Sequence, residues 1–77
     1  MNKHFLRVRI EHSQGRTSYG YICLNDVTAY REHLEVYTLT VVEADNRTYI
    51  IHMRLSDFHK IMKKYFTIID DTNGTAS

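Results

Sequence analysis

The stretch that decides the fold runs from Glu35 to Phe66 and reads EVYTLTVVEADNRTYIIHMRLSDFHKIMKKYF. Its first two parts, Val36 to Ala44 and Thr48 to Leu55, place apolar residues at alternate positions, and side chains two residues apart lie on the same face of a strand. Residues 45–47 (Asp-Asn-Arg) separate these parts, and Asp and Asn tolerate the backbone of a tight turn. We therefore expect a β-hairpin.

The same stretch continues into a helix, which we expect at about residues 56–66. Four apolar residues recur at i, i+3, i+4 and i+7, the spacing of one helix face: Phe58, Ile61, Met62 and Tyr65. Ser56 can cap the free N–H groups of the first turn with its hydroxyl, and Asp57 places negative charge at the positive end of the helix dipole.

Two further strands are expected before this unit, at residues 4–12 and 18–24. In the first, Leu6, Val8 and Ile10 form one face and Phe5, Arg7, Arg9 and Glu11 form the other. In the second, Tyr19, Tyr21 and Cys23 alternate with Gly20, Ile22 and Leu24. Gly20 indicates a bulge or a close approach of another part of the chain.

The connection from Asn25 to Leu34 is either a loop or a short helix, and we favour the helix. Asp26 can cap it, and apolar residues at i, i+3 and i+7 would share one face: Val27, Tyr30 and Leu34. We expect a short strand from Thr67 to Asp70 and a flexible tail at residues 71–77. The predicted fold is a single α+β domain over residues 1–70, with an antiparallel sheet of four or five strands and the helix at 56–66 packed on one face.

Composition narrows the class of protein. The 77 residues contain ten Lys and Arg against nine Asp and Glu, a balance that argues against a strongly basic nucleic-acid binder and an acidic DNA mimic. Cys23 is the single cysteine, so an intrachain disulfide is excluded and a reducing compartment is the default. The chain has no signal-peptide core and no membrane-spanning apolar run, so we expect a cytoplasmic protein.

The sequence contains no pattern typical of catalysis or of metal binding. The five histidines lack the HxH and HxxxH spacings, and the three glycines do not form a phosphate-binding loop. A Cys23–histidine pair is a minor enzyme hypothesis, because no nucleophile motif surrounds this cysteine. We expect a non-enzymatic protein without a metal or a cofactor.

The main functional hypothesis is binding to another protein. If Ile22 and Leu24 face the core, Tyr19 and Tyr21 point outward, with Arg7 and Arg9 nearby as further anchors, and Arg and Tyr are common in binding hot spots. A small chain of this kind would act as a regulator or an inhibitor, of the type found in phages and mobile elements. Exposed outer strands also make a homodimer one expectation.

The alternative is an anionic-ligand module that uses a basic helix face. Lys60, Lys63 and Lys64 lie opposite the apolar residues of the predicted helix, and Arg54 precedes them. These cations could contact the phosphates of a phosphoinositide headgroup or of a nucleic acid. Lysines near a helix C-terminus are also favourable without any ligand.

Three segments carry a partial family resemblance: Tyr37–Val41 (YTLTV), Arg47–Tyr49 (RTY) and Met53–His59 (MRLSDFH). Over residues 21–66 the chain resembles the first half of a PX (phox-homology) domain. In that family a three-stranded antiparallel sheet leads into a helix through a motif of the form Arg-Arg-Tyr-Ser-Asp-Phe and binds phosphoinositide headgroups. The resemblance implies that Arg54 contacts the lipid phosphate and that Phe58 packs under the helix. Met53 stands in place of the first arginine, and Leu55 replaces the aromatic residue that stacks on the inositol ring.

Overall fold

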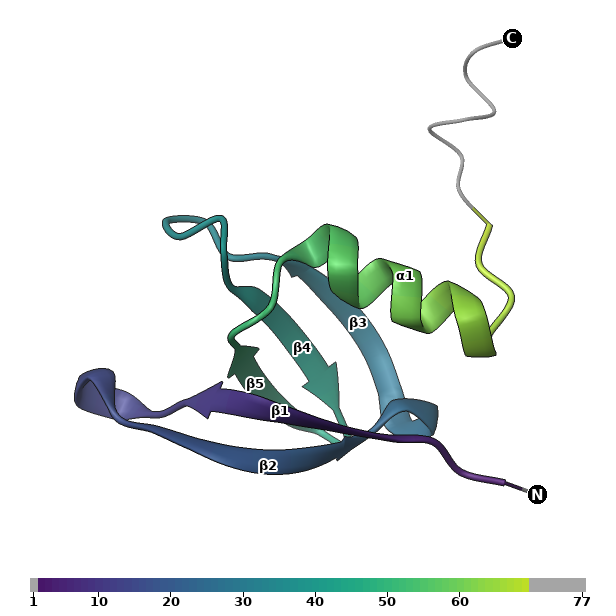
Figure 1. The fold of residues 1–77 in the computed structure, drawn as a ribbon, viewed down its shortest axis with the longest axis horizontal. Coiled ribbons are helices and arrows are strands. Elements are labelled where there is room, and N and C mark those ends of the chain that lie inside the picture. The colour runs from purple at the N-terminus through teal and green to yellow at the C-terminus, as the bar shows by residue number, and fades with distance from the viewer. Residues whose placement is uncertain (1, 70–77) are drawn as a thin grey trace, which may run out of the picture.

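The computed structural model describes residues 2–69, which form a five-stranded antiparallel sheet with one α-helix on its inner face (Figure 1). The elements are β1 (Phe5–Glu11), β2 (Thr17–Cys23), β3 (Val27–Glu32), β4 (Thr40–Ala44), β5 (Arg47–Ile51) and α1 (Leu55–Tyr65). Short 3-10 helices at Ser13–Gly15 and Leu24–Asp26 follow β1 and β2. The predicted α+β class, with a small antiparallel sheet and one main helix, is confirmed. Asp70 and the expected tail at residues 71–77 lie outside the described residues.

The strands lie in the order β2-β1-β5-β4-β3, so β2 and β3 form the two edges. β1 pairs with β2 along its whole length, from Phe5 opposite Cys23 to Glu11 opposite Thr17. Its pairing with β5 is restricted to two residues, Ile10 and Glu11. The β1–β2 hairpin therefore diverges from the β3–β4–β5 meander, and Figure 1 shows α1 lying across the inner side of this bent sheet, close to β3.

The core lies between the inner face of the sheet and α1. Its buried apolar residues are Val8, Ile22, Leu24, Val42, Ala44, Ile51, Phe58 and Met62. The alternation predicted for β1 and β2 is confirmed, because Val8 and Ile22 are buried while the residues beside them in the chain are more exposed. Phe58 and Met62 anchor the helix, whereas Tyr65 is 43% exposed and stacks on the His4 ring, with ring centroids 4.3 Å apart.

The predicted hairpin turn between β4 and β5 is confirmed, although both strands are shorter than expected. Asp45 and Asn46 have φ angles of 52° and 62°, the left-handed conformations that a two-residue type I′ turn requires. β4 begins at Thr40 instead of Val36, because residues 33–39 turn back on themselves. In that turn the Nδ1 atom of His33 accepts the backbone N–H groups of residues 35 and 36, both at 3.1 Å. β5 ends at Ile51 instead of Leu55.

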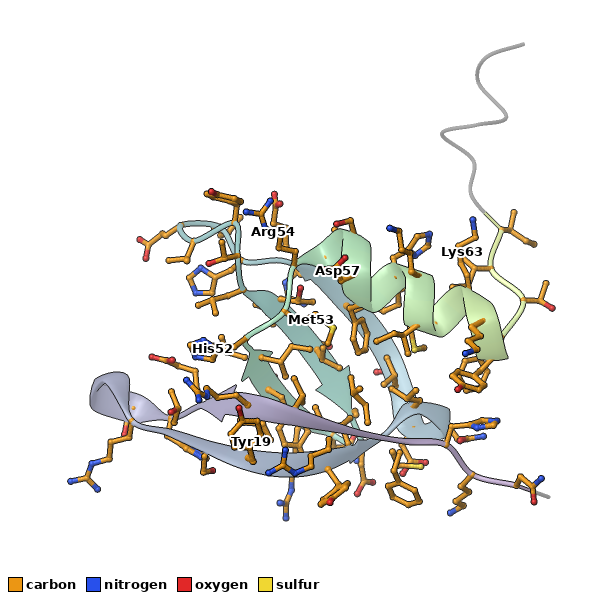
Figure 2. The ribbon with its side chains drawn as sticks, viewed as in Figure 1. Tyr19, His52, Met53, Arg54, Asp57 and Lys63 are labelled. Atoms are coloured by element: carbon orange, nitrogen blue, oxygen red, sulfur yellow. The ribbon has the colours of Figure 1, made fainter. Side chains whose placement is uncertain are left out.

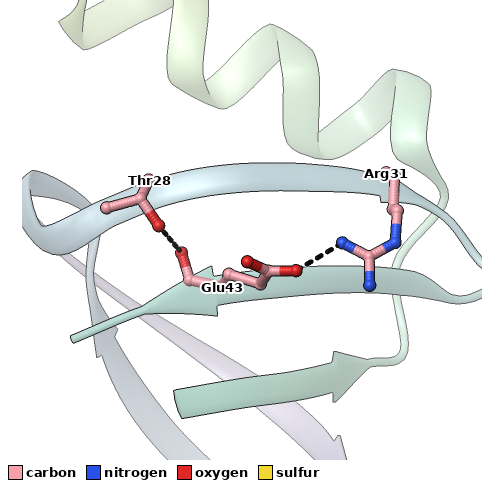
Figure 3. A network of polar contacts seen from close by, with 3 residues as sticks. All are labelled: Thr28, Arg31 and Glu43. Atoms are coloured by element: carbon pink, nitrogen blue, oxygen red, sulfur yellow. Dashed lines mark hydrogen bonds and ion pairs between the residues drawn. The ribbon is translucent and has the colours of Figure 1, made fainter. Parts of the chain in front are cut away.

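The helix favoured for residues 26–34 is wrong, because most of this segment is strand β3. Val27 pairs with Ala44, and the register shifts before Ala29 pairs with Glu43, so a bulge at Thr28 adds one residue. Residues three apart, Val27 and Tyr30, therefore both face the core, which is the spacing that resembled a helix. At the bulge the Thr28 hydroxyl donates to the Glu43 carbonyl at 3.2 Å, a contact that Figure 3 shows.

The expected N-cap is also wrong, since α1 begins at Leu55 and Arg54 occupies the cap position without a side-chain bond. The carbonyl of Arg54 accepts the N–H groups of Asp57 and Phe58, both at 3.0 Å, so Ser56 already lies inside the first turn. Asp57 does lie in that turn, as predicted. Residues 67–69 are not a strand, and Asp70 of the expected strand is outside the described range.

Gly20 marks a close approach without a bulge. The β1–β2 register is continuous through the pair formed by Val8 and Gly20. A Cβ atom at Gly20 would lie 2.8 Å from Cδ1 of Ile10, so the missing side chain leaves space for Ile10 on the inner face.

Candidate functional site

The register of the β1–β2 hairpin brings the four residues of the main binding hypothesis onto one surface. Arg7 lies opposite Tyr21, and Arg9 lies opposite Tyr19. These side chains point away from the core because they alternate with the buried residues of both strands. Tyr19 is 54% exposed and Tyr21 is 70% exposed. We call this surface the arginine–tyrosine face; Figure 2 shows Tyr19 on this hairpin.

Both arginines of this face are held on the ring of Tyr19. The guanidinium carbon of Arg7 lies 4.1 Å from the ring centroid, and that of Arg9 lies 5.1 Å from it. The Nη2 atom of Arg9 also donates to the Tyr19 hydroxyl at 3.3 Å. These contacts restrict two long side chains that would otherwise sample many rotamers.

Neither arginine is neutralised by a carboxylate in the part of the chain that the structure describes. The ion pair there is Arg31–Glu43 at 2.6 Å, between β3 and β4, and the carboxylate of Glu11 is hydrogen-bonded to His52 at 2.7 Å. Glu11 follows Arg9 on the outer face of β1 but binds toward β5, away from the arginine pair. The arginine–tyrosine face is therefore a positive, aromatic surface whose guanidinium groups have no ion-pair partner within residues 2–69.

Sequence reasoning left Phe5 out of this site. Phe5 is 60% exposed and pairs with Cys23, so it extends the same outer face beyond Arg7. The alternation of β1 already placed Phe5 with the arginines, and that signal was sufficient to include it. The His52–Glu11 pair was not predictable from spacing, because it depends on β1 lying beside β5.

The four cations of the alternative hypothesis do not converge on one point. Arg54 lies at the N-terminal end of α1, and Lys63 and Lys64 lie in its last turn (Figure 2). At 1.5 Å per residue, Arg54 and Lys64 are separated by about 15 Å along the axis. Lys60, Lys63 and Lys64 are exposed, and the Arg54 guanidinium stacks instead on Tyr37, 4.8 Å from its ring centroid.

A cavity of about 570 Å³ lies beside Arg54, where β3, the turn after it and the start of α1 meet. Its lining residues are Tyr30, Glu32, Tyr37, Arg54, Leu55, Ser56 and His59. The hydroxyl of Tyr30 and Nδ1 of His59 are hydrogen-bonded at 2.8 Å, and burial raises the pKa of Tyr30 above 10.0. Sequence reasoning did not predict the contact between Tyr30 and His59, because the strand that carries Tyr30 was expected to be a helix.

The histidines are dispersed among different partners. His12 contacts the Ser18 hydroxyl at 2.6 Å, His33 binds its own turn, and His52 and His59 contact Glu11 and Tyr30. No group of three or more His, Cys, Asp or Glu side chains within residues 2–69 is placed to hold a metal ion. The thiol of Cys23 is free and partly buried.

Two findings bear on the wider context of the chain. The helix present in the described residues is not long and apolar enough to cross a membrane. Comparisons with protein-family models, curated proteins and solved structures find no match to this chain.

Proposed function

We propose that this chain is a non-enzymatic binding protein that recognises another protein through the arginine–tyrosine face. The observation that carries the proposal is the pair of arginines stacked on Tyr19, to which no carboxylate of the described residues is paired. Such a pair offers guanidinium donors to acidic side chains of a partner, and guanidinium groups bind carboxylates in a bidentate geometry.

The arrangement also favours affinity on physical grounds. Tyrosine and arginine are enriched among the residues that dominate binding energy. Stacking on Tyr19 already restricts both guanidinium groups in the unbound protein, so less side-chain entropy is lost on binding. A chain of 77 residues that occupies a partner's surface in this way would act as a regulator or an inhibitor, as small phage and mobile-element proteins do.

The test compares matched variants in capture from a host lysate, followed by titration with the captured protein. Arg7→Ala/Tyr21→Ala removes two side chains of the face, and Lys60→Ala/Lys63→Ala removes two exposed side chains of α1. The first pair should weaken the partner's affinity by about thirtyfold or more, the factor for loss of a hot spot. The second pair should change it little. A partner that is retained by the first pair and lost from the second would contradict the proposal.

A second candidate function is binding of a phosphoinositide headgroup beside Arg54, as the partial resemblance to PX domains implies. The favourable observation is the cavity, which has an arginine and Tyr37 in its wall at the point where a three-stranded meander enters a helix. Glu32 in the same wall opposes an anion, and the lysines at the far end of α1 are too distant to help.

Vesicle sedimentation tests this second candidate. Vesicles of phosphatidylcholine with and without a phosphatidylinositol phosphate are compared for the wild type, Arg54→Ala and the control Lys63→Ala. The candidate requires binding that is lost in Arg54→Ala and kept in Lys63→Ala, and that weakens steeply with salt. Binding that is the same with and without the phosphatidylinositol phosphate, or that does not change with salt concentration, would exclude this candidate function.

A further inference from the structure

β2 forms one edge of the sheet, and two backbone hydrogen bonds at the ends of the β1–β2 hairpin show which of its backbone groups point to the free side. The Leu24 N–H donates to the carbonyl of His4 at 2.7 Å, and the His12 N–H donates to the carbonyl of Arg16 at 2.6 Å. Both pairs continue the β1–β2 register at its two ends. They therefore mark the hydrogen-bonded pairs of the ladder, which alternate with non-bonded pairs along antiparallel strands.

This alternation turns the backbone groups of the odd-numbered β2 residues toward the open edge. Because the even-numbered residues of β2 bond to β1, the N–H and C=O groups of Thr17, Tyr19 and Tyr21 and the N–H of Cys23 point the other way. The carbonyl of Cys23 is already used, because Cys23 is the N-cap of the 3-10 helix Leu24–Asp26. The same rule turns the carbonyl of Arg9 away from β2, and that carbonyl accepts the His52 N–H on the opposite side at 2.9 Å. The residues with free backbone groups are thus the ones whose side chains lie on the outer face.

The two edges of the sheet differ in how well they resist pairing. β3 carries a bulge at Thr28 and two charged residues, Arg31 and Glu32, which are features that discourage an added strand. β2 is seven residues long and reads TSYGYIC, without a charge or a proline. β2 is therefore the edge that is open to a further strand.

We propose that the partner docks by adding an extended acidic segment to the free edge of β2. This inference rests on the proposed function and specifies its binding mode. The added backbone would pair with Tyr19, Tyr21 and Cys23, and every second side chain of the segment would lie on the outer face. Arg7 and Arg9 belong to β1 but stack on Tyr19 of β2, so their guanidinium groups already reach toward the edge. Carboxylates on the added strand would neutralise them.

A second copy of this chain is a poorer occupant of the same edge. Pairing of β2 with β2 of another molecule would continue the outer face across the junction. It would bring two arginine pairs together, and the described residues supply no carboxylate to them. Like charges placed close together across an interface oppose association. Charge complementarity therefore selects an acidic segment of a different protein.

Amide hydrogen exchange of the ¹⁵N-labelled wild-type protein tests the mode directly. The probe is a heptapeptide with alternating aspartate and valine, and its control has lysine in place of aspartate. Saturating acidic peptide should slow exchange at Tyr19, Tyr21 and Cys23 by at least about fivefold, the factor for one net hydrogen bond. Gly20 and Ile22, which bond to β1, should be protected before the peptide is added.

A proline variant then removes one free donor of the edge. Cys23 has a φ of −76°, which proline adopts readily, and its N–H is not used by β1. Cys23→Pro should weaken peptide binding by about fivefold or more, while Cys23→Ala, which keeps the N–H, should bind as the wild type does. Circular dichroism of both variants verifies that they fold, and if the proline variant unfolds, the wild-type exchange data decide alone.

Several outcomes would overturn the proposal. These are unchanged exchange at the three edge residues, equal slowing by the lysine peptide, and slowing that rises with protein concentration in the absence of peptide. The last result would assign the edge to a second copy. A natural partner that is lost from Arg7→Ala/Tyr21→Ala but binds Cys23→Pro normally would refute only the added strand. A partner that binds both variants normally would refute the proposed function as well.

Discussion

Thr40 is a fully buried polar residue, and its replacement by valine tests how the sheet is joined to the helix. Its hydroxyl donates to the backbone carbonyl of Met53 at 2.7 Å, across the link between β5 and α1. Helix α1 does not use that carbonyl, because the N–H groups of Asp57 and Phe58 both donate to Arg54. Thr40 is therefore the partner that satisfies it.

Valine has the same shape as threonine but has no donor, so Thr40→Val isolates the hydrogen bond. Leaving a buried acceptor without a donor costs about 1–3 kcal/mol. We expect a cost in the lower half of this range, because the hydrogen bond between Thr40 and Met53 is only partly buried. The added methyl group recovers part of that loss. We expect the free energy of unfolding to fall by about 1 kcal/mol, which corresponds to a Tm lower by about 4–8 °C in a domain of this size.

Urea and thermal unfolding followed by circular dichroism measure both quantities. Thr48→Val is the matched control, because Thr48 is exposed on β5 and the same change there should alter stability by less than about 0.5 kcal/mol. Thr40→Ser keeps the hydroxyl and loses the methyl group, so it separates packing from hydrogen bonding. A Thr40→Val protein as stable as the wild type would refute the reasoning, since the Met53 carbonyl would then need no partner.

Three further changes have expected outcomes that equilibrium unfolding can measure. Asn46→Ala should lower the free energy of unfolding by about 1 kcal/mol and Asn46→Gly should leave it almost unchanged, because a φ of 62° strains alanine but not glycine. Equal losses of stability in the two variants would contradict the turn geometry. Phe58→Ala should lower the free energy of unfolding by about 3–5 kcal/mol, since Phe58 is fully buried. The whole free energy of unfolding of a 77-residue domain is about 4–11 kcal/mol, so an unchanged helix signal and Tm would contradict the role of Phe58 as the anchor. Above pH 10 the unfolded chain releases the Tyr30 proton before the folded one does, so the folded state binds more protons and stability falls as the pH rises. Tyr30→Phe should flatten this decline, and a decline as steep as that of the wild type would assign it to other groups.

Burial on one face explains which elements could be predicted from the sequence. β1 and β2 show period-two alternation because one side of each packs on the core, and α1 shows its own period for the same reason, whereas Thr40, Val41 and Val42 of β4 are all buried. The failures are local interruptions of these periods. The bulge at Thr28 makes Val27 and Tyr30 share a face at a spacing of three, and a spacing of three is indistinguishable from a helix turn in one sequence.

The start of the helix was missed for a different reason. Ser56 is a good capping residue by type, but the backbone of Arg54 already turns into the helix two residues earlier. The Thr40–Met53 bond fastens that part of the chain to β4, and it joins residues 13 positions apart. A local rule for capping does not include such a contact.

The residues of the arginine–tyrosine face could be predicted from the sequence, but the free edge of β2 beside them could not. Alternation alone places Arg7 and Arg9 on the face opposite Val8, and Tyr19 and Tyr21 on the face opposite Ile22. Stacking on Tyr19 depends on the exact register of the hairpin. The β2 edge is exposed because the other side of β1 pairs with β5, and this pairing joins residues about forty positions apart in the chain. Sequence periodicity carries no information about that choice.

The stability of the fold does not account for the arginine–tyrosine face. An exposed cation–π contact contributes about 0.5–1 kcal/mol, and the entropy lost in ordering two long side chains offsets part of it, so the net gain on folding is small. Removing Arg7 should therefore leave the free energy of unfolding within about 0.5 kcal/mol of the wild type. The same residue should be costly to lose in a complex, where a carboxylate would pair with it. A large effect on binding with a negligible effect on stability would show that Arg7 serves recognition. A large loss of stability would instead show that Arg7 serves the fold.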